Sequence, residues 1–286
     1  MTTSLHAGTA TRTGRQMLNK VPEVTVYFWI IKILCTTVGE TAADYLNVNL
    51  GLGLTGTTYI MGTVLVVVLA GQFALRRYVP GVYWLAVVLL SIVGTLITDN
   101  LSDNFDVALE TTTIVFSIAL AVTFAAWYAS EKTLSIHTIS TTRREAFYWL
   151  AILFTFALGT AAGDLTAERL DVGYPLSALG FGALIAIVAA AHYGFQARRS
   201  AAERGLSTSN AVLAFWIAYI LTRPLGASIG DYLSQSPDDG GLGLGTVGTS
   251  ALFLLTILVL VIYLSVTRRD RLDAPGEDAA SRPTPA

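Results

Sequence analysis

The sequence has few of the residues on which soluble enzymes commonly rely. Charged residues make up only 13% of the 286 positions, and the single cysteine, Cys35, excludes an intramolecular disulfide and a cysteine-based metal cluster. The three histidines, His6, His137 and His192, are scattered and form no ligand set of familiar spacing. No Ser/His/Asp or zincin-type constellation occurs, so we do not expect an enzyme.

Long hydrophobic runs dominate the chain, of which 53% is hydrophobic. A helix needs roughly 20 mostly apolar residues to cross a bilayer, where unpaired backbone groups are costly. Eight stretches meet this need, near residues 24–46, 55–76, 81–99, 108–130, 146–165, 174–197, 209–232 and 243–267. The polar first 22 residues lack the apolar core of a signal peptide, so the first helix is expected to direct insertion. The sequence therefore predicts an all-α integral membrane protein with eight transmembrane helices.

Positive charge collects in alternate loops. The positive-inside rule places these loops and both termini in the cytoplasm. The residues concerned are Arg12, Arg15, Lys20, Arg76, Arg77, Lys132, Arg143, Arg144, Arg198, Arg199, Arg204, Arg268, Arg269 and Arg271. The opposite loops are acidic, with Asp103, Asp106, Glu168, Asp171, Asp238 and Asp239, and Arg169 is their one basic residue. We expect a multi-pass protein of a bacterial inner membrane.

One pattern recurs four times without a gap, once in each odd-numbered hydrophobic stretch. An aromatic-Trp pair is followed by nine residues and a Gly, then by four residues and an Asp. The copies are Phe28-Trp29, Gly39, Asp44; Tyr83-Trp84, Gly94, Asp99; Tyr148-Trp149, Gly159, Asp164; and Phe215-Trp216, Gly226, Asp231. Since each unit holds two spans, successive units run parallel, with pseudo-symmetry about the membrane normal.

The first two positions of the pattern favour structural roles. Each Trp lies near the start of its helix, where an indole suits the membrane interface. Each Gly is followed four residues later by Ala, Thr or Gly, a spacing that lets helices approach closely. We expect the tryptophans to anchor the helices and the glycines to pack them.

The aspartate lies roughly 22 Å along the helix from the Trp, at the predicted carboxyl end. A carboxylate at that depth is costly unless it faces the bundle interior, a partner or water, and the helix dipole disfavours an anion there. An acid in the outer headgroup region is the structural alternative. The fourfold recurrence instead favours a cation site formed by Asp44, Asp99, Asp164 and Asp231.

Three charged residues break the repeat. Glu40 stands where the other units have Thr95, Thr160 and Ala227, and it shares a helical face with Asp44. Carboxylates select hard cations, and the hydroxyls of Thr36, Thr41, Thr95, Thr98 and Thr160 are candidate supporting ligands. Close carboxylates can also share a proton, which leaves a proton site as the alternative. Lys32 either snorkels to the cytoplasmic surface or stays inside, and Arg223, beside Pro224, is expected to pair with an acid.

These repeats resemble a bacterial integral membrane family of unknown function that has four units of two helices, each with a fixed tryptophan. The similarity is clearest in the first unit, from Lys20 through Phe28-Trp29 to the run Gly39-Glu40-Thr41-Ala42-Ala43-Asp44. The resemblance covers about residues 20–267 and implies an architecture without a biochemistry. We divide the chain into repeats 23–78, 79–132, 144–200 and 208–267, with disordered cytoplasmic tails at 1–22 and 268–286.

The leading functional hypothesis is a transporter for a cation, a divalent metal ion such as Mn²⁺, that binds to Glu40, Asp44, Asp99, Asp164 and Asp231. A passive cation or proton channel that uses the same acids stays open. So does a structural or sensory membrane module in which the acids only set helix depth. The expected partners are the lipid bilayer and the cation substrate. No nucleic acid and no cofactor beyond a bound divalent cation are expected, and the oligomeric state is left open.

Overall fold

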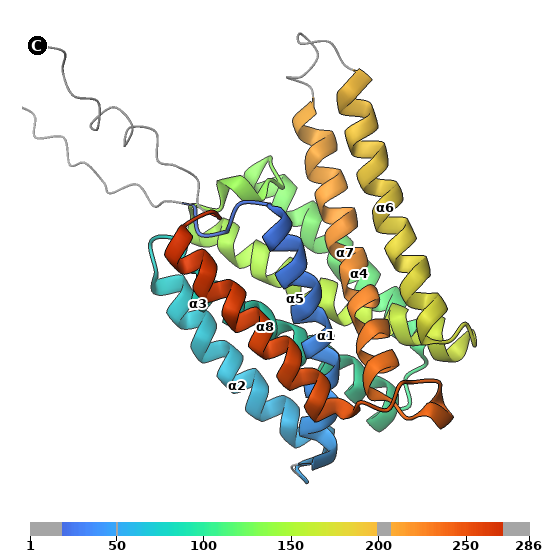
Figure 1. Ribbon diagram of the computed structural model, residues 1–286. Helices are drawn as coiled ribbons and strands as arrows, with labels where there is room; N and C mark the ends of the chain where they lie inside the picture. The colour runs from blue at the N-terminus through green and yellow to red at the C-terminus, as the bar shows by residue number, and fades with distance from the viewer. Residues whose placement is uncertain (1–18, 50, 199–206, 271–286) are drawn as a thin grey trace, which may run out of the picture.

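The structure, a computed structural model, describes residues 19–49, 51–198 and 207–270, and these residues contain eight long helices (Figure 1). They are α1 (Val26–Asn49), α2 (Gly53–Ala74), α3 (Pro80–Asp99), α4 (Leu109–Glu131), α5 (Thr142–Asp164), α6 (Tyr174–Arg198), α7 (Ser207–Ser234) and α8 (Gly245–Thr267). The π-helical turns η1 (Asn100–Asn104) and η3 (Leu165–Arg169) prolong α3 and α5, and η2 (Ile136–Thr138) and η5 (Pro237–Asp239) are short 3₁₀ turns. Each long helix is apolar and long enough to cross a membrane, which confirms the eight predicted spans.

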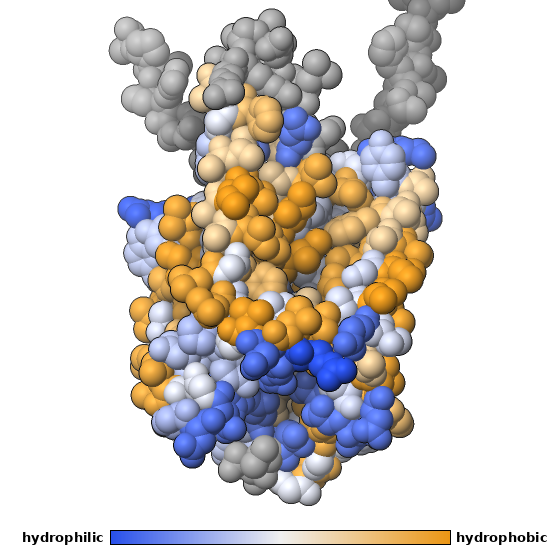
Figure 2. Space-filling model, turned by 90° about the vertical axis from the view of Figure 1, so that its right-hand side faces the viewer, coloured by the Kyte–Doolittle hydropathy of each residue, from blue (hydrophilic) through white to orange (hydrophobic). Residues whose placement is uncertain are grey.

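The helices form an inner and an outer ring. In α1, α3, α5 and α7, between 50% and 78% of the most apolar stretch is buried, whereas in α2, α4, α6 and α8 the share is between 6% and 28%. Figure 2 shows hydrophobic residues over much of the visible face and hydrophilic residues gathered toward its lower end. The inner helices therefore make the core, and the outer helices present their apolar sides to the bilayer.

Each outer helix packs mainly against the inner helix of the next repeat. Thus α2 lies on α3, α4 on α5, α6 on α7, and α8 returns to α1. The inner helices also contact one another in a cycle, α1 with α3, α3 with α5, α5 with α7 and α7 with α1. This closed ring confirms the predicted arrangement of four parallel two-helix units about one axis.

The repeated glycines are the points where neighbouring inner helices touch. A Cβ on Gly39 would meet Ser91, on Gly94 it would meet Phe156, on Gly159 Arg223, and on Gly226 Thr36. Every glycine thus contacts the residue that lies three positions before the glycine of the next repeat. The glycine of the fourth repeat makes the same contact with the first repeat. The packing role expected for the four glycines is confirmed by this geometry.

The repeated tryptophans lie inside the bundle. Trp84, Trp149 and Trp216 are buried, and Trp29 is half-buried. They form an aromatic cluster with Phe28, Tyr83, Tyr148, Phe215 and Tyr219. Neighbouring aromatic rings thus cover the indoles of Trp84, Trp149 and Trp216, a packing role beyond the membrane-interface anchoring that we expected.

The two ends of the described chain meet at the end of the bundle that holds this cluster, which we call the terminal end. The backbone N–H of Glu23 donates to the Asp270 carbonyl at 3.0 Å, and the Tyr78 hydroxyl donates to the Asp270 carboxylate at 2.6 Å. Lys20 is buried and pairs with Glu145 at 2.6 Å. Residues 19–22 and 268–270, which we predicted as parts of the tails, therefore pack on the bundle, and residues 1–18 and 271–286 lie outside the described chain.

Basic residues lie in or beside the helix ends at this same terminal end, among them Arg76, Lys132, Arg143 and Arg268. Of the basic residues predicted to face the cytoplasm, Arg12, Arg15, Arg199, Arg204 and Arg271, together with the Arg198 side chain, fall outside the described part of the structure. The aspartates of the repeat lie at the opposite end, which we call the acidic end.

Four-residue steps along each inner helix define levels between the two ends. From the terminal end, the first level holds the aromatic residues that precede the tryptophans, Phe28, Tyr83, Tyr148 and Phe215. The second level holds Lys32, Val87, Ile152 and Tyr219, and the third holds Thr36, Ser91, Phe156 and Arg223. The fourth level holds Glu40, Thr95, Thr160 and Ala227, and the fifth holds Asp44, Asp99, Asp164 and Asp231. All residues of the second, third and fourth levels are buried. The repeat thus stacks equivalent positions in layers through the centre of the ring.

Candidate functional site: an acidic cavity above a buried ion pair

A polar cavity of about 170 Å³ opens at the acidic end. All five predicted ion-binding residues line it, and they come from the four inner helices. The carboxyl groups in its wall belong to Glu40, Asp44, Asp99, Asp103, Asp164, Glu168 and Asp231. The fold therefore brings together acids that are spread over about two thirds of the sequence.

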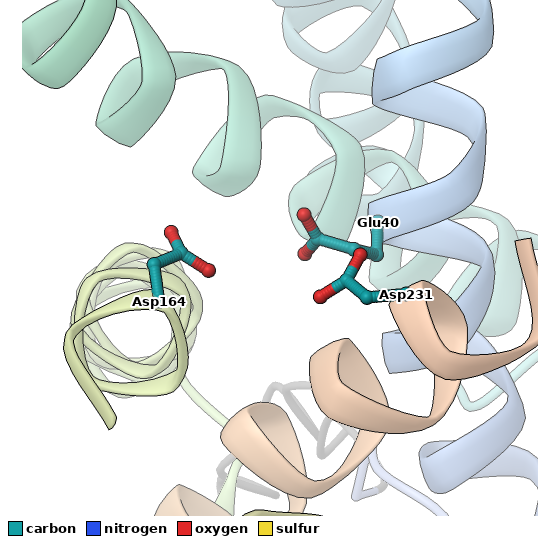
Figure 3. A group of neighbouring side chains, drawn as sticks. All are labelled: Glu40, Asp164 and Asp231. Carbon is teal, nitrogen blue, oxygen red and sulfur yellow. The ribbon is translucent and has the colours of Figure 1, made fainter. Parts of the chain in front are cut away.

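Three of these carboxylates form a closer group. One oxygen each of Glu40, Asp164 and Asp231 lies within 4.8 Å of the others. Figure 3 shows the three side chains pointing toward one another from α1, α5 and α7. Negative charges this close repel unless a cation or a shared proton lies among them. The group thus offers oxygen ligands from three repeats to a hard cation.

The α-helices α3 and α5 end at their aspartates, as expected, but the helical path continues beyond the aspartate in every repeat, which was not expected. Helix α1 continues to Asn49 and α7 to Ser234, while π-helical turns extend α3 and α5 by five residues each. Side chains stabilise these turns: the Ser102 hydroxyl donates to the Thr98 carbonyl, and the Thr166 hydroxyl to the Ala162 carbonyl. Such π-helical turns occur often at functional sites.

The two extra turns add acids that sequence reasoning missed. Asp103 and Glu168 were assigned to loops, but each follows an aspartate of the repeat by four residues. Because the helical path continues, both side chains line the cavity. The four-residue spacing that pairs Glu40 with Asp44 also occurs in Asp99/Asp103 and Asp164/Glu168, and it was the available signal.

Arg223 lies beneath the cavity and contacts it through Glu40, without lining it. Its guanidinium donates to Glu40 Oε2 at 2.7 Å, to the Thr160 hydroxyl at 2.6 Å, to the Thr36 carbonyl at 3.1 Å, and to the Thr95 hydroxyl. Arg223 is fully buried and Glu40 nearly so. One side chain from the third level thereby reaches every polar residue of the fourth. The predicted ion pair is confirmed, with Glu40 as the partner.

The predicted supporting threonines divide into two groups. Thr95 and Thr160 contact Arg223, so they lie beside the site. The hydroxyls of Thr36, Thr41 and Thr98 bond to neighbouring helices: Thr36 to the Thr222 carbonyl, Thr41 to Ser250, and Thr98 to the Ala157 carbonyl. Thr36 and Thr98 therefore join neighbouring inner helices, and Thr41 joins α1 to the outer helix α8.

Lys32 lies on the terminal side of Arg223 and does not snorkel. It is fully buried, and its Nζ lies 4.0 Å from the Phe156 ring centroid and 4.3 Å from that of Tyr219. These two rings cover the amine, and no part of the side chain reaches the surface. Of the two positions considered for Lys32, the structure shows the interior one.

Eight membrane-capable helices in a closed fourfold ring, with acids converging at one end, define a multi-pass helical membrane protein built from tandem repeats. The family model described as Repeat of Unknown Function (DUF347) matches residues 27–78, 82–133, 147–198 and 214–270, and the chain belongs to this family. Each match covers one inner helix and the outer helix that follows it. Comparison with curated proteins finds no match. Comparison with solved structures finds none either.

Proposed function

We propose that the protein transports a cation, a divalent metal ion such as Mn²⁺, and binds it in the acidic cavity. The observation that carries this proposal is the convergence of Glu40, Asp164 and Asp231 from three repeats into one cavity on the axis of a membrane protein. A binding site on the central axis suits a substrate that must cross the bilayer. Acids that only set helix depth would have no reason to meet.

The chemistry of the wall favours a hard cation. Carboxylate oxygens dominate it, with the amides of Asn47 and Gln235 and the hydroxyl of Ser102 as further oxygen donors. Mg²⁺, Ca²⁺ and Mn²⁺ prefer such ligands, whereas softer ions prefer sulfur or imidazole. The Glu40–Arg223 pair offsets one negative charge, which leaves the aspartates to attract the cation.

Charge also supports an orientation. The basic side chains gather at the terminal end, so the positive-inside rule places that end in the cytoplasm and the acidic cavity on the opposite side. In a bacterium this corresponds to the inner membrane. In this orientation the cavity collects cations from outside, and the buried levels beneath it close the cytoplasmic side.

The test combines binding and flux. Purified protein is titrated with Mn²⁺ by calorimetry, and proteoliposomes with an entrapped manganese-quenched dye report uptake. We expect saturable uptake by the wild type. Asp164→Asn and Asp231→Asn should each weaken binding by at least about tenfold, because a charge near the cation is lost. Asp44→Asn and Asp99→Asn should weaken it less, since neither belongs to the close group.

Asp238→Asn is the matched control, because Asp238 is exposed and outside the cavity wall. It should bind and transport Mn²⁺ as the wild type does. Wild-type binding by all four aspartate variants would contradict the proposed site. Flux that rises linearly with Mn²⁺ concentration would contradict a transporter and indicate a channel.

A further inference from the structure

Lys32 is a buried amine without a hydrogen-bond partner. Its Nζ is enclosed, and none of the described residues accepts a hydrogen bond from it. Two aromatic ring faces, those of Phe156 and Tyr219, are its close contacts. A charge in a membrane interior is normally paired, so an amine in this setting is suited to exist in either protonation state.

The titratable and charged groups around Lys32 come from each inner helix. On α1 these are Cys35 and, roughly 12 Å further along the helix, Glu40. Helix α7 contributes Tyr219 and Arg223, and the hydroxyls of Tyr83 on α3 and Tyr148 on α5 lie toward the terminal end. Helix α8 carries one titratable residue, Tyr263, which packs on Tyr27 instead.

Of the two buried basic side chains, Arg223 and Lys32, only Lys32 is suited to change its charge. Arg223 is held by Glu40, Thr36, Thr95 and Thr160, and a guanidinium stays protonated in proteins. Lys32 has no carboxylate beside it, and an ammonium on the axis would repel a divalent cation that moves beyond Glu40. Since Arg223 already places one fixed positive charge on this path, a neutral Lys32 amine keeps a second charge from adding to the barrier against the cation.

We propose that Lys32 binds and releases one proton in each transport cycle, so that passage of the cation is exchanged for passage of a proton. This inference rests on the proposed transport function. In the step itself, the neutral Lys32 amine takes one proton from water on one side of the membrane and becomes an ammonium. It returns that proton to water on the other side, and no other bond changes.

Buried hydroxyls extend from Lys32 toward the terminal end. The Tyr219 hydroxyl is buried, and the Tyr83 and Tyr148 hydroxyls lie 2.5 Å apart. The Tyr83 ring packs on Tyr78, whose hydroxyl donates to Asp270 at the terminal end. Neither Lys32 Nζ nor the Tyr219 hydroxyl has a hydrogen-bond partner among the described residues, so a proton reaches Lys32 from these hydroxyls only when the groups between them rearrange.

The experiment measures Mn²⁺ uptake and proton flux together, in proteoliposomes with entrapped metal- and pH-sensitive dyes. Wild-type protein should export protons when Mn²⁺ enters, and an opposed pH gradient should accelerate uptake. Lys32→Met, which is uncharged and of similar length, should bind Mn²⁺ as the wild type does but lose the Mn²⁺-driven proton flux. Lys32→Arg, which stays charged, should retain binding and lose both fluxes.

Lys132→Met is the control, because it removes an exposed lysine at the end of α4. It should keep both fluxes. Mn²⁺-driven proton flux in Lys32→Met, or Mn²⁺ uptake without proton flux in the wild type, would overturn the inference and leave the transporter intact. Absence of any saturable Mn²⁺ uptake by the wild type would overturn the proposed function, and the inference with it. Lys32→Arg transporting as the wild type would also overturn the inference, independently of how Lys32→Met folds.

Discussion

The fifth level of the inner ring and the fourth level beneath it are carried by the same four helices, one helical turn apart. The fifth level has an aspartate in every repeat, whereas the fourth has Glu40, Thr95, Thr160 and Ala227. The repeated residues build the ring and make one end acidic. The unrepeated charges, Lys32, Glu40 and Arg223, occupy its buried centre. A charge in the membrane interior is costly, so these charges occur once and are not multiplied by the repeat; Glu40 and Arg223 pair with each other, whereas Lys32 contacts two aromatic rings.

Even the repeated aspartates are not equivalent in the fold. Asp231 is buried and joins Asp164 and Glu40 in the close group, while Asp44 and Asp99 line the same cavity outside it. Glu40, from the fourth level, takes the place in the group that a symmetric arrangement would give to an aspartate. The unrepeated acid therefore decides which carboxylates at the acidic end form the close group.

The largest expected effect on stability comes from removing Arg223, the basic residue that pairs with Glu40. Arg223→Met leaves Glu40 as a buried, unpaired charge beside other acids, and should lower the free energy of unfolding by about 3–5 kcal/mol without added metal. Thermal unfolding in detergent with a chelator measures the change. In Glu40→Gln/Arg223→Met most of the loss should be recovered, because no unpaired charge remains.

Arg169→Met is the matched control for that substitution. Arg169 pairs with Glu110 at 3.3 Å, but both side chains are exposed, so the loss should not exceed about 1 kcal/mol. Equal stability of Arg223→Met and the wild type would contradict the assignment of the Glu40–Arg223 pair to the buried centre.

A smaller effect should separate repeated inner glycines from outer ones. In Gly226→Ala the new methyl group would press on Thr36 and the Thr37 backbone, and we expect a loss of about 1–3 kcal/mol. Gly71→Ala, on α2, has open space around it and should be neutral or stabilise the helix by up to about 1 kcal/mol. Thermal unfolding of both variants measures the difference, and equal losses would argue against the closed inner ring.

The smallest expected effect tests whether tryptophans at the same position of the repeat contribute equally to the free energy of unfolding. The Trp216 indole donates to the Leu134 carbonyl at 2.9 Å, whereas the Trp149 indole nitrogen has no acceptor among the described residues. Trp216→Phe should therefore cost about 0.5–1.5 kcal/mol more than Trp149→Phe, by the loss of one hydrogen bond. Chemical unfolding of the two variants in parallel gives this difference, and a zero or negative value would refute it.

Much of the site could be predicted from residue spacing. The five acids were identified because they recur or break a recurrence, and the Arg223 pairing follows from the cost of an unpaired charge in a membrane. Asp103 and Glu168 were missed because hydropathy ends the helices at the aspartates, whereas hydrogen bonds from Ser102 and Thr166 prolong them. The tryptophans were assigned to the interface because depth in the bilayer can be estimated from sequence, but the direction of a side chain around its helix cannot.

Hydropathy, spacing and loop charge by themselves determined the eight spans, the fourfold repeat and the presence of acids near one end. These properties depend on distance along a helix, which sequence position measures directly. Only the tertiary structure decided which acids meet, that Arg223 reaches Glu40 across 183 residues, and that Lys32 stays inside. Those outcomes depend on how each helix is rotated and which helix it packs against, and the small residues at the contacts of the inner ring fix that rotation.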